Sequence, residues 1–365
     1  MRAKLEDVCV RGSSSLKQSD VIDKTGEYPI YGAAGYIGNV DFYHQDQPYI
    51  AVVKDGAGIG RTSLYPAKSS VIGTMQYLLP KENVLPEYLC YVVKYMHLEK
   101  YFTGATIPHI YFKDYKKEEF NLDILDRQKE IVNILGRIEC VISSRQQELQ
   151  KLDELIKARF VEMFGTLHDN ENGFEVVTIE NVCSLIKDGT HQTPQYTEDR
   201  EKGYKFLSSK DVMSQKIDWA DIKYIPAELH EKLYATIKPQ RNDILMSKNG
   251  VNYGVAAVND TDEVFDIYVS LALLRPKKII DPVFFRCVIN NPETKRQFDS
   301  SIKGIGVPNL HLGEIKKTQI LLPPKELQKE FVVFVEQVDK SKVAVQKALD
   351  ETQKLFDSLM QQYFG

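Results

Sequence analysis

The fold is decided by residues 128–165, which read QKEIVNILGRIECVISSRQQELQKLDELIKARFVEMFG. Apolar residues recur there every three or four positions, charged and amide residues lie between them, and no proline interrupts the run. This spacing predicts a long helix with one apolar stripe that must be buried, and Gly136 is its only weak point. The predicted stripe contains Ile131, Leu135, Ile138, Val141, Ile142, Leu149, Leu152, Leu155, Ile156 and Met163.

The end of the chain repeats this pattern. A helix of about 36 residues at 1.5 Å per residue extends about 54 Å, which is too long for an ordinary domain helix. Such a length suits two helices that pack on each other. The second predicted stripe contains Phe331, Phe334, Val335, Val338, Val345, Leu349, Thr352, Phe356, Leu359 and Tyr363.

The two helices belong to a repeat that runs through the whole chain. Matching segments keep their order from start to end, and from residue 104 onward the second copy follows the first at a constant offset of 200 residues. Chance matches do not keep order in this way, so the chain is two copies of one plan. The matches are 5–9 with 179–183, 54–56 with 248–250, 79–81 with 275–277, 104–108 with 304–308, 128–130 with 328–330, and 164–165 with 364–365.

The front of each copy predicts a mixed α+β domain built mainly from short strands. Residues 49–53 and 244–247 are typical of strands, and each is followed by a turn with glycine, at Gly56 and Gly250. Residues 86–95 and 282–290 are typical of helices with a proline in the first turn. We therefore expect globular segments at 1–121 and 166–322 and helical segments at 122–165 and 323–365.

Composition and charge narrow the class of protein. Hydrophobic residues make up 43% and charged residues 27% of the chain, as in ordinary soluble globular proteins. We see no apolar stretch long enough to span a bilayer, no signal peptide, and no CxxC pair among the five cysteines. These features favour a cytoplasmic protein with no membrane partner. The net charge of −4 is unusual for a free-standing DNA binder, which normally has a basic footprint.

The most specific local motifs lie in the second copy. Residues 304–310 are Gly-rich, residues 320–324 form an aliphatic run that ends in two prolines, and residues 327–330 open the helix with Leu-Gln-Lys-Glu. Residues 188–191 read Asp-Gly-Thr-His. Together with the order of the repeat, these segments resemble the specificity (S) subunits of type I restriction–modification systems over the full length of the chain.

The resemblance implies a fold and a function. It implies two tandem mixed α/β target-recognition domains that alternate with two long helices packed as an antiparallel coiled coil. Each domain would read one half of a bipartite target in double-stranded DNA, and the helices would set the spacer. Two DNA adenine methyltransferase (modification) subunits would be partners, and restriction and translocase subunits could join them. Partners that share the phosphate contacts would explain the near-neutral charge.

Catalytic motifs give no competing assignment. Gly56, Gly58 and Gly60 could suggest a nucleotide loop, but Pro66 follows too soon for the required helix, so we expect a tight hairpin turn. Residues 281–284 lack the second proline of an adenine methyltransferase motif and read as a helix start. The sequence contains no GxxxxGK[ST] and no HExxH. We therefore expect a non-catalytic subunit without a cofactor or a metal.

DNA contacts are expected on polar loop residues of both copies. Lys54 and Lys248, which precede equivalent turn glycines, are the candidates for phosphate contacts. Residues that differ between the copies are candidates for base contacts. In the first copy these are Arg61, Thr62, His109, Ser13, Ser14 and Ser15, and in the second copy Lys187, Thr190, His191, Lys210, Asn252 and Asn309. The aromatic residues Tyr31, Tyr36, Tyr43 and Tyr253 are expected in the core.

Two other classes of protein stay open at this stage. A fused methyltransferase or nuclease would act on DNA without partners. A coiled-coil adaptor would join partners without reading a sequence, and the near-neutral charge fits it. Binding that weakens with salt and depends on a split sequence would separate DNA readout from both alternatives.

Overall fold

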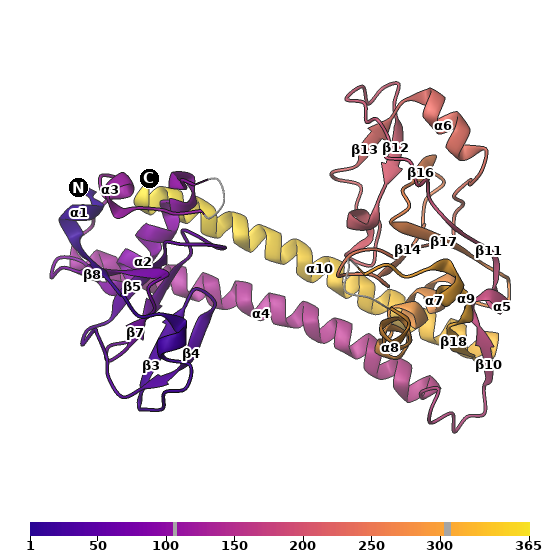
Figure 1. Cartoon of the computed structure of the whole chain (residues 1–365), viewed down its shortest axis with the longest axis horizontal. Helices are drawn as coiled ribbons and strands as arrows, with labels where there is room; N and C mark the ends of the chain where they lie inside the picture. The colour runs from indigo at the N-terminus through magenta and orange to yellow at the C-terminus, as the bar shows by residue number, and fades with distance from the viewer. Residues whose placement is uncertain (105–107, 303–307) are drawn as a thin grey trace. The chain divides into compact units, whose positions relative to one another are not determined.

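The computed structural model describes residues 1–104, 108–302 and 308–365. The chain forms two compact units, unit 1 with residues 1–148 and 345–365, and unit 2 with residues 149–344 (Figure 1). Helices α4 (Leu125–Phe164) and α10 (Lys325–Phe364) have 40 residues each, and each gives one end to each unit. The Gly-rich segment predicted at 304–310 lies largely outside the described residues, as does most of its counterpart at 104–108.

Unit 1 contains a four-stranded antiparallel sheet in the order β2-β8-β5-β6, a three-stranded sheet β4-β3-β7 and the pair β1-β9. Helix α2 covers β5 and β6. The elements are β1 (Arg2–Lys4), α1 (Leu5–Val8), β2 (Cys9–Ser13), η1 (Gln18–Asp20), β3 (Tyr28–Gly32), β4 (Gly35–Val40), β5 (Tyr49–Val53), β6 (Thr62–Tyr65), β7 (Ser70–Val71), β8 (Met75–Pro80), α2 (Pro86–Tyr95), η2 (Leu98–Tyr101), α3 (Phe112–Tyr115) and β9 (Glu119–Asn121).

Unit 2 repeats these sheets with the orders β11-β17-β14-β15, β13-β12-β16 and β10-β18. Unit 2 also contains helices α6 and α8. The described part of unit 1 has no α-helix at the equivalent positions in the order of elements along the chain. The elements are β10 (Glu175–Thr178), α5 (Ile179–Val182), β11 (Cys183–Asp188), β12 (Tyr204–Leu207), η3 (Ser209–Val212), β13 (Lys223–Ile225), α6 (Ala227–Tyr234), β14 (Ile244–Ser247), β15 (Ala256–Val258), β16 (Phe265–Ile267), β17 (Leu271–Pro276), α7 (Pro282–Ile289), α8 (Pro292–Ser301), α9 (Leu312–Lys317) and β18 (Gln319–Leu322).

The predicted repeat is confirmed strand by strand. The predicted strands at 49–53 and 244–247 are β5 and β14, which occupy the same position in equivalent sheets. Equivalent glycines also make equivalent backbone bonds, because Gly60 N–H donates to Val53 at 2.9 Å and Gly254 N–H donates to Ser247 at 2.7 Å. The β5–β6 connection is a hairpin, as expected, but it runs from residue 54 to residue 61 and is longer than a tight turn.

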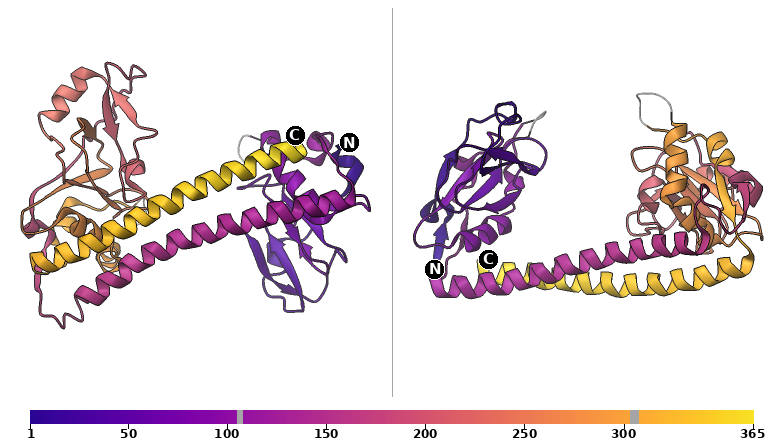
Figure 2. Two further views of the ribbon diagram at one scale, coloured as in Figure 1. Left: turned by 180° about the vertical axis from the view of Figure 1, so that it is seen from behind. Right: turned by 90° about the horizontal axis from the view of Figure 1, so that it is seen from below.

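The two long helices pack antiparallel within each unit. In unit 1, Ile131 and Leu135 of α4 share a core with Met360 and Phe364 of α10. In unit 2, Arg159 of α4 pairs with Glu330 of α10 at 3.3 Å. In Figures 1 and 2, the ends of α4 and α10 that belong to one unit lie side by side. The stripe prediction was wrong at two positions, because Val141 and Leu155 are exposed (42% and 46%).

The C-terminal ends of the helices are anchored by matching Phe-Gly pairs. In unit 2, Phe164 is fully buried and its ring centroid lies 5.1 Å from that of Phe284 on α7 and 5.4 Å from that of Phe331 on α10. In unit 1, Phe364 is fully buried against Tyr88 on α2 at 5.2 Å. Each copy therefore ends on an aromatic residue that completes the core of one unit.

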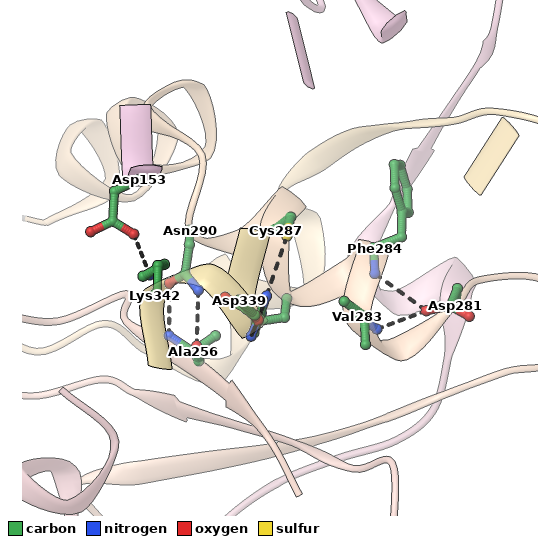
Figure 3. Close-up of polar contacts among 10 residues, drawn as sticks. Asp153, Ala256, Asp281, Val283, Phe284, Cys287, Asn290, Asp339 and Lys342 are labelled. Atoms are coloured by element: carbon green, nitrogen blue, oxygen red, sulfur yellow. Dashed lines mark hydrogen bonds and ion pairs between the residues drawn. The ribbon is translucent and has the colours of Figure 1, made fainter. Parts of the chain in front are cut away.

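Buried glutamines join the N-terminal ends of the helices to the globular parts. Gln328 is fully buried, accepts the Asp281 N–H at 2.8 Å, and donates to the carbonyls of Ile279 and Pro323. Gln128 makes the equivalent three bonds in unit 1. The Asp281 carboxylate then caps α7 by accepting from Val283 and Phe284 (Figure 3). This linkage fixes α7 to the start of α10.

Candidate nucleic-acid interface

The predicted DNA contacts gather mainly at one end of the four-stranded sheet in each unit. Because neighbouring strands are antiparallel, the end of one strand lies beside the start of the next. In unit 1 the register pairs Ser13 with Gln76, Val53 with Met75, and Val52 with Thr62. In unit 2 it pairs Asp188 with Ala272, Ser247 with Leu271 and Met246 with Ala256. We call these edges, with the loops that follow them, the recognition ends.

In each recognition end, the loop after the central strand is hydrogen-bonded to a second backbone segment, which is residues 108–110 in unit 1 and residues 308–310 in unit 2. We call this pairing of two segments the backbone crossing. In unit 1, Ile110 N–H donates to Lys54 at 2.9 Å and Gly56 N–H donates to Pro108 at 3.0 Å. In unit 2, the equivalent donors bond Lys248 at 2.7 Å and Pro308 at 3.0 Å. Gly56 and Gly250 have positive φ angles (84° and 85°), a conformation that glycine adopts without strain. The crossing brings His109 beside Asp55, and Asn309 beside Asn249.

The crossing in unit 1 carries a small charged cluster. His109 Nδ1 lies 2.7 Å from one oxygen of Asp55, and Lys54 Nζ lies 3.2 Å from the other. All three side chains are partly exposed, so a ligand can reach them. Thr62 is different, because it is buried and its hydroxyl donates to the Gly60 carbonyl at 3.0 Å. A base contact by Thr62 would require this bond to break.

Arg61 and the three serines complete the recognition end of unit 1. Arg61 is exposed and donates to the Ala33 carbonyl at the tip of the β3–β4 hairpin, at 3.1 Å. Ser13 and Ser15 are exposed, and the half-buried Ser14 accepts the Leu16 N–H at 3.2 Å. These groups offer donors and acceptors next to the crossing.

Lys248 is placed differently from the prediction. Its ammonium group is buried, with only 5% of the side chain exposed, and lies 3.1 Å from Asp188 Oδ2. Asp188 also lies 3.2 Å from His191 Nε2. A phosphate could reach Lys248 only by displacing Asp188, so the expected phosphate contact does not fit this arrangement. The pair instead ties the end of β11 to the loop after β14.

The other candidates of unit 2 divide into two groups. Asn252, Asn309, His191 and Lys187 are exposed at the recognition end, and Thr190 is half-buried, with its N–H bonded to the Ile267 carbonyl at 3.1 Å. Lys210 lies on η3 and pairs with Asp221 at 2.8 Å. The hydrogen bond from Lys210 to the Asp221 carboxylate raises the pKa of the lysine. The ammonium group of Lys210 is therefore already paired with a carboxylate.

Two aromatic residues were placed wrongly in the core by the sequence. Tyr36 is 62% exposed and Tyr43 is 40% exposed, whereas Tyr253 is buried as expected. Tyr31 is half-buried and stacks on Tyr65, with 3.8 Å between ring centroids. The sequence carried no signal that separates Tyr36 from Tyr31, because both flank the same hairpin tip.

Neither a metal centre nor a membrane segment is found in the described part of the chain. Across residues 1–104, 108–302 and 308–365, the His, Cys, Asp and Glu side chains form no group of three or more that could hold a metal ion. The helices in these ranges are not long and apolar enough to cross a bilayer.

The two units have equivalent sheet ends that carry different polar side chains, and both units contain parts of the same two long helices. This arrangement defines a protein with two related recognition domains. The chain belongs to the family described as type I restriction modification DNA specificity domain, whose model matches residues 1–154 and 171–353. It is thus a type I DNA specificity subunit, which confirms the predicted family, fold class and general function.

Relatives and solved structures agree with this assignment. The MjaVIII specificity subunit of Methanocaldococcus jannaschii is 22% identical over 333 residues, covering 85% of this chain and 77% of that protein. The MjaIX specificity subunit of the same organism is 22% identical over 307 residues, covering 78% and 69%. The crystal structure of the type I S subunit from M. genitalium covers 100% of this chain and 96% of its own, with a TM-score of 0.57 and 14% identity, and so shares the fold.

Proposed function

We propose that this chain directs a type I restriction–modification complex to a bipartite target in double-stranded DNA. The recognition end of unit 1 reads one half, the recognition end of unit 2 reads the other, and α4 and α10 set the spacer. One observation carries the proposal: the two recognition ends share a backbone crossing but present different polar side chains. Asp55 and His109 in unit 1 stand where unit 2 has Asn249 and Asn309.

The side chains divide by the kind of contact they can make. Lys54 is the phosphate candidate, because it is partly exposed next to the crossing. Base contacts fall to exposed donors and acceptors, and the best bidentate pairs contribute about 1–3 kcal/mol of discrimination. Lys248 acts as a positioning residue through Asp188. The base-contact set is Ser13, Ser14, Ser15, Arg61 and His109 in unit 1, and Lys187, Thr190, His191, Asn252 and Asn309 in unit 2, with Thr62 and Lys210 as contacts that need rearrangement.

Catalysis resides in partner subunits under this proposal. Two DNA adenine methyltransferase subunits bind the chain and methylate the target, and restriction and translocase subunits can join for cleavage. A structural neighbour with a TM-score of 0.54 comes from a study of complex assembly in a type I restriction–modification system. The chain then works where the DNA is, in the cytoplasm. The family match favours DNA readout over the coiled-coil adaptor.

Mapping of adenine methylation in genomic DNA tests the proposal directly. Cells that carry this chain with its methyltransferase should methylate one bipartite motif, and deletion of the chain should abolish that methylation. A His109→Ala variant should change the motif in one half only, and an Asn309→Ala variant in the other half only. Methylation that is unchanged by the deletion, while the methyltransferase is active, would contradict the proposed function.

A further inference from the structure

A pocket of about 230 Å³ opens in unit 2 beside the recognition end. One wall is the segment after β11, the opposite wall is formed by α6 and the residues after it, and β16 contributes Asp266 and Ile267. Leu233, Ile237 and Pro239 make much of the lining aliphatic. Thr190 also lines the pocket and belongs to the DNA-contact set proposed above, whereas Leu233, Ile237 and Asp266 do not.

The polar group on β16 is an incompletely satisfied carboxylate. The Asp266 side chain is only 2% exposed, and its Oδ2 lies 2.7 Å from His230 Nδ1. His230 is held in turn by stacking on Tyr204, with 3.6 Å between ring centroids. Asp266 Oδ1 is buried without a hydrogen-bond partner among the described residues. Burial raises the pKa of Asp266, and the neighbouring His230 opposes this shift only in part.

Unit 1 has a different side chain at the same position of the equivalent sheet. In unit 1, β7 pairs in parallel with β3, and in unit 2, β16 pairs in parallel with β12. The registers of these two pairs make Ser70 the counterpart of Asp266. The Ser70 hydroxyl is buried but satisfied, because it accepts the His44 N–H at 2.9 Å. The described residues between β4 and β5 also contain no counterpart of α6. Asp266 and the α6 wall therefore belong to unit 2 and have no equivalent in the described part of unit 1.

We propose that this pocket binds a primary alkylammonium cation, with its aliphatic chain along Leu233 and Ile237 and its N–H donors on Asp266. Burial of a carboxylate oxygen without a hydrogen-bond donor costs free energy, and a charge-assisted N–H···O hydrogen bond offsets that cost. Aliphatic walls disfavour a hydrated metal ion, and the described residues offer no metal-binding group of three ligands. Asp188 on the rim adds a second carboxylate, although Lys248 and His191 already contact it.

Calorimetric titration of the full-length chain without DNA tests this pocket. We expect n-butylammonium chloride to bind saturably and tetramethylammonium chloride, which has the same charge but no N–H, not to bind. Asp266→Asn should weaken butylammonium binding by at least about tenfold, a difference of about 1.4 kcal/mol. Asp260→Asn is the matched control, because it removes the same charge from an exposed position of unit 2 and should leave binding unchanged.

A second variant keeps the test decisive if Asp266→Asn does not fold. Leu233→Phe enlarges a half-buried side chain on the pocket wall and leaves the carboxylate in place, so it should block the aliphatic chain and abolish binding. Absence of saturable butylammonium binding to the unmodified chain overturns the proposal. Equal binding by a folded Asp266→Asn or Leu233→Phe variant also overturns it. Because no DNA is present, either result leaves the proposed DNA function untouched.

Discussion

Replacement of Gln328 by methionine tests whether a buried amide fixes α10 to unit 2. Methionine has a similar length and shape, so the change removes hydrogen bonds with little loss of packing. Three bonds disappear, to Asp281 N–H and to the carbonyls of Ile279 and Pro323. At about 1 kcal/mol net for each bond, unit 2 should lose about 3 kcal/mol of unfolding free energy.

The single tryptophan makes this loss measurable in unit 2 alone. Trp219 lies in unit 2 and packs on Phe265, with 5.7 Å between ring centroids. Its fluorescence should follow the urea unfolding of that unit. With a slope of about 2 kcal/mol/M, a loss of about 3 kcal/mol lowers the midpoint by about 1.5 M.

Gln128→Met is the matched control for this experiment. It removes the three equivalent bonds in unit 1, so it should lower the circular-dichroism transition and leave the Trp219 transition nearly in place. The reasoning is refuted if Gln328→Met moves the Trp219 midpoint by less than about 0.3 M. It is also refuted if both variants move that midpoint equally.

Two further substitutions probe the recognition ends. Gly189→Ala should destabilise unit 2 by at least about 2 kcal/mol, because the added Cβ would lie 2.1 Å from the Ile267 carbonyl oxygen. It should also reduce methylation of the target. A normal Trp219 unfolding transition together with full methylation would contradict this prediction. Lys248→Met should lower the free energy of unfolding by about 2 kcal/mol, because it removes the buried ammonium group that pairs with Asp188. Lys54→Met should lower it by less than about 1 kcal/mol, because the ion pair with Asp55 is partly exposed. Equal losses in urea unfolding would show that the burial of Lys248 has no energetic consequence.

Periodicity predicted the helices well, but not which apolar residues they cover. Spacing of three and four residues reports one face of a helix, so both long helices could be located within a few residues of their ends. The width of the covered face depends on the partner helix and on the neighbouring domain. Val141 and Leu155 fall at the edge of the predicted stripe and are exposed, a result that no local pattern distinguishes from burial.

The sequence located the loops of the candidate site but not the ion pairs within them. The repeat located the turn glycines, and from them the loops that form the recognition ends. Lys248 and Lys54 look equivalent in sequence, yet Asp188 pairs with Lys248 from 60 positions away, while Lys54 pairs with its neighbour Asp55. The counterpart of Asp188 in unit 1 is Ser13, by their register with β17 and β8. Long-range pairs of this kind leave no signal in a single sequence.

The net charge of −4 and these ion pairs together predict how DNA binding by the chain depends on salt. Lys54 and Lys248 have carboxylate partners, whereas Arg61 and Lys187 have none among the described residues. If Lys54 makes its phosphate contact and one of the two base-contact cations, Arg61 or Lys187, also neutralises a phosphate, log K for the isolated chain should fall with log salt at a slope of about −2. Addition of the methyltransferase subunits should make the slope much steeper, because they bring further cations to the phosphates. A slope of about −6 for the chain alone would mean that the ion pairs open on DNA and that partners are not needed to hold the backbone.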